Sequence, residues 1–208
     1  MHPNTSFRKA DDAQNIAFAR ERGFGTLALN ADGGPLMAHI PFALQVDGTS
    51  ADLHLVRSNP ILRLLDAPQD AVIAVIGPDG YVSPDWYDVP DQVPTWNYVA
   101  VHLRGTLTRL PQDDMPAMLD MQTAHFEEKL APKPAWRPQK MTPAVLEKMM
   151  RQIVPCRLTV KAISGTWKLS QNKPDAVRLR AADRIETTTT GSETQTLAHL
   201  MRTPPDTQ

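Results

Sequence analysis

Cysteine is almost absent from this chain of 208 residues, since Cys156 is the only one. A single cysteine excludes an internal disulfide and cannot complete a thiolate metal site. Cys156 lies in the apolar stretch VPCRLTV, which favours a small buried strand residue over a reactive nucleophile. Long apolar runs are also lacking, and the N-terminal MHPNTSFRKADD has no apolar signal core. We therefore expect neither a transmembrane helix nor export, and a cytoplasmic location.

Positive charge is not in excess, with 22 Lys and Arg against 23 Asp and Glu and a net charge of −1. An autonomous DNA-binding domain carries a basic surface, and no helix-turn-helix with a basic recognition helix is visible in the sequence. The chain also lacks both glycine-rich phosphate loops, G-x-G-x-x-G after a strand and G-x-x-x-x-G-K-[ST]. Direct nucleic-acid binding and nucleotide binding through either loop are therefore not expected.

The histidines form neither H-x-x-x-H nor H-E-x-x-H, so no local metal motif is present. They are His2, His39, His54, His102, His125 and His199. His39, His54 and His102 lie on expected strands, where two interpretations stay open. They converge on a metal or haem, or each is a hydrogen-bonded strand residue, which is the more common case. Ser83 and Ser170 lack the elbow sequence of a serine nucleophile.

Short apolar stretches separated by glycine and proline indicate strands, with a few stretches of helical periodicity between and after them. The expected strands are residues 25–30, 35–46, 52–58, 70–78, 97–110 and a last pair flanking Gly165 within 155–171. The expected helices are residues 11–22, 59–67, 112–130 and 142–152. Because hairpin turns replace most crossover helices, the pattern predicts a mainly β (α+β) fold, an antiparallel barrel with flanking helices. Residues 187–208 are typical of a polar tail with a short amphipathic stretch, TLAHLMR.

Residues 77–102 concentrate amphipathic aromatic side chains in a segment with four prolines, which is typical of a loop. The segment holds two of the four tryptophans and all three tyrosines: Trp86, Trp96, Tyr81, Tyr87 and Tyr98. Such residues cover a barrel end, stack on a flat ligand or form a subunit interface. The segment has four aspartates and no lysine or arginine, which argues against single-stranded nucleic acid as the stacking partner.

Two polar patterns indicate ligand contacts. Arg57, Ser58 and Asn59 close an expected strand immediately before a helix, where exposed amides, the helix dipole and an arginine suit a phosphate. The alternative is a helix N-cap beside an exposed arginine. Residues 167–173, WKLSQNK, follow a glycine-containing turn and are rich in hydrogen-bond donors. They suit the edge of a planar heteroaromatic ring, and the alternative is a polar surface loop.

Five motifs, in this order, resemble the PaiB family of FMN-binding negative transcriptional regulators: HIPF (39–42), HLVRSNP (54–60), GPDGYVSPDWY (77–87), VPTWNYVAVHLRG (93–105) and KLSQNK (168–173). The resemblance covers roughly residues 1–180 and implies an FMN-binding split β-barrel domain. We bound this domain at residues 1–186, including its C-terminal helices and last strands. The resemblance also implies FMN as cofactor and a homodimer with two flavin sites at the subunit interface. The implied fold is similar to that of pyridoxamine-phosphate oxidases and flavin reductases.

The resemblance further implies a set of FMN-binding residues. The strand whose backbone lies along the isoalloxazine ring corresponds to His39, Ile40, Pro41 and Phe42. The strand end that holds the phosphate corresponds to Val56, Arg57, Ser58 and Asn59. The partner subunit contributes Trp96, Asn97, Tyr98, Lys168, Gln171 and Asn172, and the pocket is shaped by Trp86 and Tyr87.

Two features depart from the family pattern. The N-terminal Met1-His2-Pro3 differs from a Met-Tyr-x-Pro start, and residues 187–208 lie outside the resemblance. Because no DNA-binding motif is present, an indirect role in negative transcriptional regulation is expected. The alternative is an FMN-dependent oxidoreductase or flavin reductase acting on a small molecule, with Tyr98, His39 and His102 as candidate acids or bases. A haem-binding split-barrel protein is a third interpretation.

Overall fold

The computed structural model describes residues 2–205 and divides them into two compact units. The barrel unit comprises residues 16–74 and 103–162, and the terminal unit comprises residues 2–15, 75–102 and 163–205. Three long strands supply residues to both units: β4 (Gln69–Val82), β5 (Thr95–Arg109) and β6 (Ile153–Lys168).

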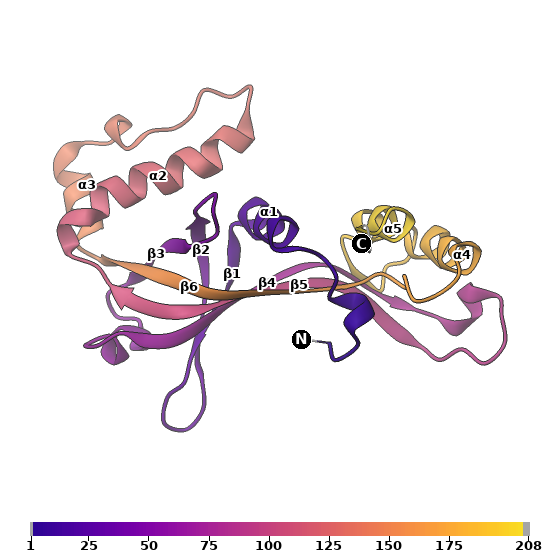
Figure 1. Cartoon of the computed structure of the whole chain (residues 1–208). Helices are drawn as coiled ribbons and strands as arrows, with labels where there is room; N and C mark the ends of the chain where they lie inside the picture. Colours follow the sequence, from indigo (N-terminus) through magenta and orange to yellow (C-terminus); the bar gives the residue numbers. More distant parts are fainter. Residues whose placement is uncertain (1, 206–208) are drawn as a thin grey trace. The chain divides into compact units, whose positions relative to one another are not determined.

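The barrel unit is a closed antiparallel barrel of six strands (Figure 1). In order around the barrel they are β1 (Phe24–Leu29), β2 (Leu36–Leu44), β3 (Ser50–Val56), and then parts of β6, β5 and β4. β1 pairs with β2 on one side and with β4 on the other, where Leu27 lies opposite Ile73. This second pairing closes the ring, and it confirms the antiparallel barrel that the strand pattern predicts.

Alternation along the strands fills the barrel with apolar side chains, because successive residues of a strand point to opposite faces. Completely buried side chains include Leu27, Phe42, Leu53, Ile73, Leu103 and Leu158. Each contributes about 1.5–3 kcal/mol relative to an exposed position. Cys156 is completely buried in the same core, which confirms its expected role as a buried strand residue. Burial raises the pKa of its thiol to about 12.

Helix α2 (Met115–Glu127) is fixed to the barrel by a chain of buried polar contacts. Asp52 on β3 is buried and accepts two hydrogen bonds from the Arg157 guanidinium across the β3–β6 pair, at 2.6 and 2.8 Å. Gln122 of α2 donates to the Asp52 carbonyl at 2.9 Å, and its own Oε1 lies 2.9 Å from His54 Nδ1. Because an unpaired buried polar group is costly, these bonds define where α2 lies on the barrel.

The barrel unit also contains α3 (Pro143–Met150) and most of α1 (Asp12–Arg22). Short 3₁₀ turns, η5 (Glu128–Leu130) and η6 (Pro138–Lys140), connect α2 to α3. Helices are thus confirmed near the expected residues 11–22, 112–130 and 142–152, whereas the expected helix at 59–67 is only a 3₁₀ turn, η2 (Pro60–Leu64). No helix among residues 2–205 is long and apolar enough to cross a lipid bilayer.

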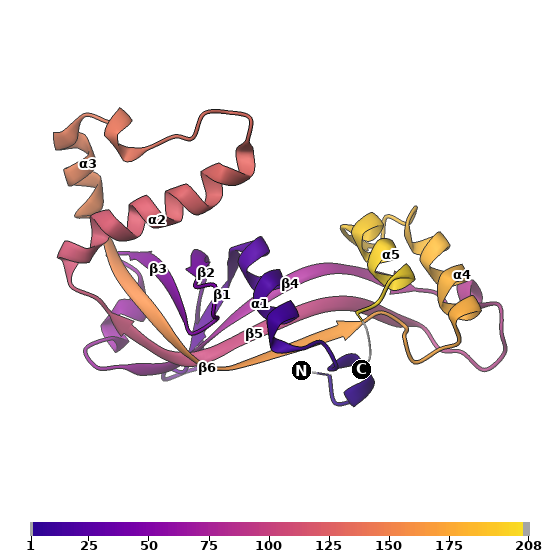
Figure 2. The same cartoon turned by 45° about the horizontal axis from the view of Figure 1, so that its top comes forward.

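The terminal unit contains the remaining parts of the three long strands and two helices that lie side by side, α4 (Asp175–Ile185) and α5 (Thr194–Arg202) (Figures 1 and 2). A two-residue strand, β7 (Gly191–Ser192), pairs with the edge of β4. Gly80 of β4 permits close helix packing, since a Cβ there would lie 2.8 Å from Ile185 Cδ1. Ile185, Leu197 and Met201 are completely buried, so both helices belong to the core of this unit.

The aromatic segment is mostly strand and not mostly loop, so that expectation is wrong. β4 continues through Pro78 to Val82 and β5 starts at Thr95, which leaves only residues 83–94 outside strands. Within this stretch, η3 (Pro84–Tyr87) is a 3₁₀ turn. On the side of β4 away from β5, Pro78 lies between the β1 pairing, which ends at Ala74, and the short β7 pairing, which begins at Asp79. A proline is tolerated at such a gap in a strand edge.

The expected pair of strands around Gly165 is wrong as well, because β6 runs unbroken through this residue. A Cβ at Gly165 would lie 2.0 Å from Asn15 Oδ1, so the glycine permits a close side-chain approach and forms no turn. Helix α4 has no counterpart among the expected helices. The amphipathic stretch TLAHLMR of the expected polar tail forms α5, and residues 206–208 of that tail lie outside the described residues.

Candidate functional site

The terminal unit holds a polar pocket of about 180 Å³. Side chains from the segment around η1 (Thr5–Phe7), from η3, from the start of β5 and from the segment after β6 line it. Of the residues that the resemblance implies, the pocket brings together Tyr87, Asn97, Lys168 and Asn172. Ser170 and Lys173 also line it, and both belong to the donor-rich segment 167–173 that the sequence indicates as a ligand contact. The remaining lining residues, which were not expected at the site, are Asn4, Phe7, Val93 and Thr95.

Asn97 is completely buried at the wall of the polar pocket. Its Nδ2 donates to Ser170 Oγ at 2.9 Å and to Met201 Sδ at 3.4 Å. Its Oδ1 has no hydrogen-bond partner among the described residues, although it is shielded from solvent. A buried acceptor without a donor costs about 1–3 kcal/mol. Asn97 therefore offers an unused acceptor to a ligand N–H in the pocket.

Ser170 shares its hydroxyl between Asn97 and Tyr87, whose Oη lies 3.0 Å from Ser170 Oγ. The backbone of Ser170 has φ +61°, in the left-handed region that a serine rarely occupies. Such a conformation costs on the order of 1–3 kcal/mol and is found most often at functional sites. Burial raises the pKa of the Tyr87 hydroxyl, and the bond to Ser170 offsets part of that rise.

Two lysines bring positive charge to the polar pocket. Lys168 donates to Thr95 Oγ1, and its Nζ lies 5.9 Å from the centre of the Phe7 ring. Lys173 donates to Gln92, and its Nζ lies 4.3 Å from the centre of the Tyr87 ring. Burial lowers the pKa of Lys168, and the neighbouring charge of Lys173 lowers it further. An anion or an electron-rich carbonyl in the pocket relieves both effects.

Other residues expected at this site are present in the terminal unit but do not line the polar pocket. Trp96 alternates with Asn97 along β5, is 47% exposed and meets the Tyr81 ring edge-on at 6.2 Å between ring centres. Tyr98 and Trp86 are half-buried. The Gln171 side chain is used locally, since it accepts from the Leu169 amide and donates to the Trp167 and Ser6 carbonyls.

The barrel unit contains the other expected ring contacts, on β2. His39 is exposed, and its Nδ1 lies 3.0 Å from Thr26 Oγ1 on the paired strand β1. Ile40 and Phe42 are buried in the barrel core, so only their backbone can meet a ligand. Pro41 is half-buried and points to the same face as His39.

The outward face of β1 and β2 is apolar and exposed. Phe24 lies opposite Pro41, and both share a face with His39 and Met37. Phe24 is 55% exposed and Met37 is 62% exposed. We call Phe24, Met37, His39 and Pro41 the outer barrel face. Phe24 and Met37 were missed by the sequence analysis, because only the strand register places them beside His39.

The end of β3 combines exposed residues with local bonds. Arg57 Nε donates to the Arg151 carbonyl at 2.7 Å, and its Nη2 donates to Gln112 Oε1 at 2.7 Å. Asn59 caps η2 by accepting from the Ile61 amide at 3.0 Å, as in the N-cap alternative. Ser58 and Val56 are exposed, and no hydrogen bond from residues 2–205 engages the Ser58 hydroxyl.

The two other histidines on expected strands, His54 and His102, do not belong to a cluster of metal-ligating side chains in the described residues. His54 is paired with Gln122, and His102 lies in the terminal unit on β5. Within the described part of the chain, no group of three or more His, Cys, Asp or Glu side chains is arranged to hold a metal ion.

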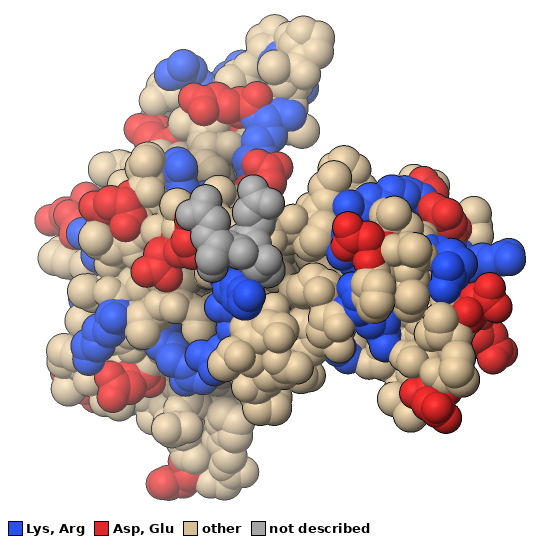
Figure 3. Space-filling view, turned by 45° about the vertical axis from the view of Figure 1, so that its right-hand side comes forward, with Lys and Arg blue, Asp and Glu red and all other residues tan. Residues whose placement is uncertain are grey.

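The surface carries charges of both signs. On the face shown in Figure 3, Lys and Arg side chains are interspersed with Asp and Glu, in keeping with the net charge of −1. A protein that binds nucleic acid through its phosphates presents clustered positive charge. This face has no such cluster.

Comparison with known proteins identifies the relatives of the chain. The model of a family described as "Putative FMN-binding domain" matches residues 1–162. The Protease synthase and sporulation protein PAI 2 of Bacillus subtilis is 30% identical over 181 residues, which are 86% of this chain and 86% of that protein.

Solved structures share the fold at lower identity. The FAD and haem binding protein of Mycobacterium smegmatis aligns with a TM-score of 0.53 at 20% identity, over 77% of this chain and 72% of that chain. The flavocytochrome Anf3 of Azotobacter vinelandii aligns with a TM-score of 0.57 at 14% identity, over 80% of this chain and 72% of that chain. At these identities the likeness concerns the fold alone.

Proposed function

Since this chain belongs to the family of FMN-binding domains, FMN is its cofactor, and we propose that two copies of the chain hold it between them. In this arrangement the polar pocket of one copy meets the outer barrel face of the other. The observation that carries the proposal is Asn97 Oδ1, a buried acceptor without a donor among the described residues. The pyrimidine edge of the flavin ring presents an N–H between two carbonyls, which suits an acceptor in a pocket that Lys168 and Lys173 also line.

The size of the polar pocket supports a second surface in the site. At about 180 Å³ it is smaller than the roughly 300–1,000 Å³ of typical ligand pockets. It therefore encloses only part of a molecule such as FMN. The outer barrel face offers what is missing, because Phe24 and Met37 expose large apolar surfaces beside His39. A second copy of the chain that covers this face also removes the exposed apolar area from water.

The end of β3 is the proposed phosphate site. Arg57 contributes positive charge there, although its Nε and Nη2 already donate to protein acceptors. The Ser58 hydroxyl is exposed beside it and suits a phosphate oxygen. Bound FMN supplies one- and two-electron redox chemistry, while these residues bind and orient it.

We further propose that any role in transcription is indirect and cytoplasmic. The resemblance to the PaiB family supports a regulatory role, and the relative from Bacillus subtilis is named a sporulation protein. The interspersed surface charges do not favour direct contact with DNA. A regulator of this kind acts through the state of its flavin or through another protein.

Titration of the purified chain with FMN and riboflavin tests the proposal. FMN is expected to bind with a Kd in the micromolar range or below, measured by the change in flavin fluorescence. Light scattering is expected to give the mass of two chains. Ser58→Asp is expected to lower the affinity for FMN at least tenfold and the affinity for riboflavin less than twofold. The reason is that a carboxylate about 4 Å from a phosphate costs on the order of 1–4 kcal/mol. Asn97→Leu is expected to weaken the binding of both FMN and riboflavin.

Thr142→Asp is the matched control, because Thr142 is also exposed and precedes a helix. It is expected to leave both affinities unchanged. Absence of FMN binding at tens of micromolar contradicts the site as proposed. Equal losses of FMN and riboflavin in Ser58→Asp contradict the phosphate assignment alone, and a single-chain mass with FMN bound contradicts the dimer.

A further inference from the structure

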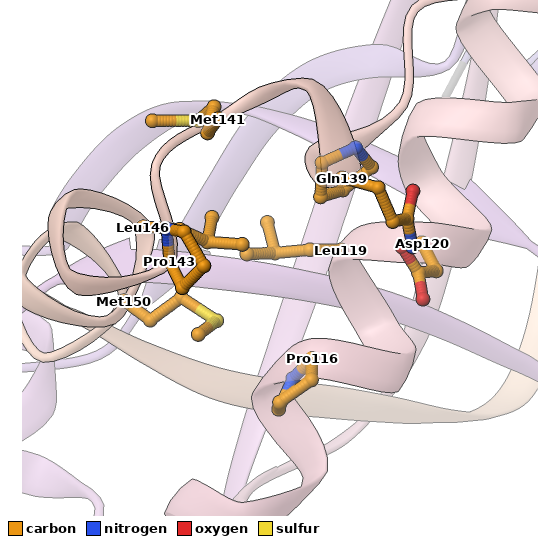
Figure 4. A pocket seen from close by; sticks show the side chains of 9 residues that line it. Pro116, Leu119, Asp120, Gln139, Met141, Pro143, Leu146 and Met150 are labelled. Carbon is orange, nitrogen blue, oxygen red and sulfur yellow. The ribbon is translucent and has the colours of Figure 1, made fainter.

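The barrel unit contains a second pocket, of about 340 Å³, between α2, η6 and α3 (Figure 4). We call it the helical pocket. It shares no lining residue with the polar pocket, the outer barrel face or the end of β3. Its volume lies in the lower part of the range for small-molecule sites, roughly 300–1,000 Å³. Neither the FMN family nor the proposed flavin site assigns it a ligand.

The walls of the helical pocket combine rigid and adaptable residues. Pro116, Pro138 and Pro143 each lie in the first turn of α2, η6 or α3, so the backbone around the pocket is fixed in φ before a ligand arrives. A preformed site avoids part of the entropy cost of binding. Met141 and Met150 supply flexible thioethers that adjust to apolar ligands of different shape.

The interior is apolar, and its polarity is confined to one end. Leu119 and Leu146 approach each other across the pocket, whereas Asp120 and Gln139 lie close together at one side (Figure 4). Asp120 is the only charged residue that lines the pocket. Among residues 2–205, no ion pair within 4.0 Å and no hydrogen bond engages the side chain of Asp120 or of Gln139. A ligand cation at this end therefore displaces no protein partner.

Among the residues that line the pocket and the hollow beside it, carboxylates outnumber cations. An adjoining hollow of about 190 Å³ shares Asp120 and Gln139 and adds Glu128 and Arg137, whose charges oppose each other. Trp136 lines the same hollow and offers an aromatic face to a cation. The other nearby carboxylates already have cationic partners, since Glu127 is paired with Lys133 and Glu147 with Arg151.

We propose that the helical pocket binds a small amphipathic amine. The apolar body lies between Leu119, Leu146 and the two methionines, and the ammonium group meets the Asp120 carboxylate and the Gln139 carbonyl oxygen. The apolar walls provide most of the affinity, and the single carboxylate selects a cation over a neutral or anionic head group. The site does not depend on the flavin assignment.

Calorimetric titration of the full FMN-loaded chain with three matched probes tests this site. n-Octylammonium is expected to bind about tenfold more tightly than n-octanol, and octanoate is expected to bind more weakly than the alcohol. Asp120→Asn is expected to lower the affinity for the amine to that for the alcohol and to leave alcohol binding unchanged. Leu146→Trp fills the pocket and is expected to abolish binding of all three probes.

Asp113→Asn is the matched control, because Asp113 is an exposed carboxylate on the turn before α2 that does not line the pocket. It is expected to leave every affinity unchanged. Met141→Trp fills the pocket from another wall and replaces Leu146→Trp if that variant does not fold by circular dichroism. Equal binding of the amine and octanoate, or binding that survives a filled pocket in a folded variant, overturns the proposal.

Discussion

Asn97, Ser170 and Tyr87 form a small buried hydrogen-bond network in which one serine hydroxyl serves two larger side chains. The network leaves Asn97 Oδ1 without a donor and holds Ser170 in a left-handed backbone conformation. Both features cost free energy in the ligand-free protein. In the proposed flavin site, the N–H of the ligand supplies the donor that Asn97 Oδ1 lacks.

Replacement of Tyr87 by Phe is expected to change the alkaline stability of the protein. Burial raises the folded-state pKa of Tyr87 above its ordinary value of 10.0, so the unfolded chain loses this proton first as pH rises. The stability of the wild type therefore falls above pH 10, by up to about 1.4 kcal/mol per pH unit from this group. The stability of Tyr87→Phe does not fall in this way with pH. At pH 8, however, the variant is less stable by about 1 kcal/mol, because it lacks the hydrogen bond to Ser170.

Urea unfolding at pH 8, 9, 10 and 11 checks this expectation. The wild type is expected to be more stable than Tyr87→Phe at pH 8, and the difference is expected to shrink above pH 10. Cys156, whose pKa is also raised, affects both proteins equally. A difference that stays constant from pH 8 to 11 contradicts a buried, neutral Tyr87.

Single residues of the site could be predicted only where a motif carried them. Asn97 and Lys168 lie in quoted motifs and line one pocket. Phe24 and Met37 lie in no motif, and their exposure follows only from the β1–β2 register. The direction of the Arg57 guanidinium depends on Gln112 and the α3–β6 junction, far along the chain, and local sequence carries no such information.

At the scale of elements, turn signals were less reliable than alternation. The barrel strands were predictable because apolar residues alternate along them and short loops join them. Pro78 and Gly165 were expected to end strands, but both lie inside one. A proline near a weakly paired edge and a glycine at a close side-chain approach have the same local sequence as turn residues. Tertiary context alone separates the two cases.

Gly105 on β5 shows what close strand approach demands. A Cβ at this position would lie 1.9 Å from the Thr159 carbonyl oxygen on β6, and a backbone atom cannot move aside as a flexible side chain can. Gly105→Ala is therefore expected to destabilise the protein by about 3 kcal/mol or more. Arg104→Ala, at the exposed neighbouring position, is expected to change stability by less than about 0.5 kcal/mol.

Urea denaturation followed by tryptophan fluorescence measures both variants. A Gly105→Ala protein with the wild-type midpoint shows that β5 and β6 can separate at this point without loss. A loss in Arg104→Ala comparable to that in Gly105→Ala shows that the effect does not come from the missing Cβ.

At the scale of the whole molecule, β4, β5 and β6 build two units from one set of strands. The alternating pattern predicts a barrel but does not reveal where each strand passes from one unit to the other, because alternation continues across that point. The C-terminal helices were hard to place for a related reason. Leu197 and Met201 are buried in a unit that includes α4, which the sequence pattern did not indicate.

Cys156 is the only cysteine and is completely buried inside the barrel. The rate at which a reagent labels its thiol therefore reports how often the barrel opens in the unmodified chain. A thiol-specific aromatic disulfide reagent is expected to label the folded protein at pH 8 at least about a thousandfold more slowly than the urea-unfolded chain. A ligand that binds only the folded state, present at about 100 times its Kd, lowers the population of the globally open state roughly a hundredfold. Labelling through global opening is expected to slow by the same factor. Binding of FMN is thus measured as a decrease in the rate of Cys156 labelling. A labelling rate that FMN leaves unchanged shows that the barrel opens without releasing the flavin.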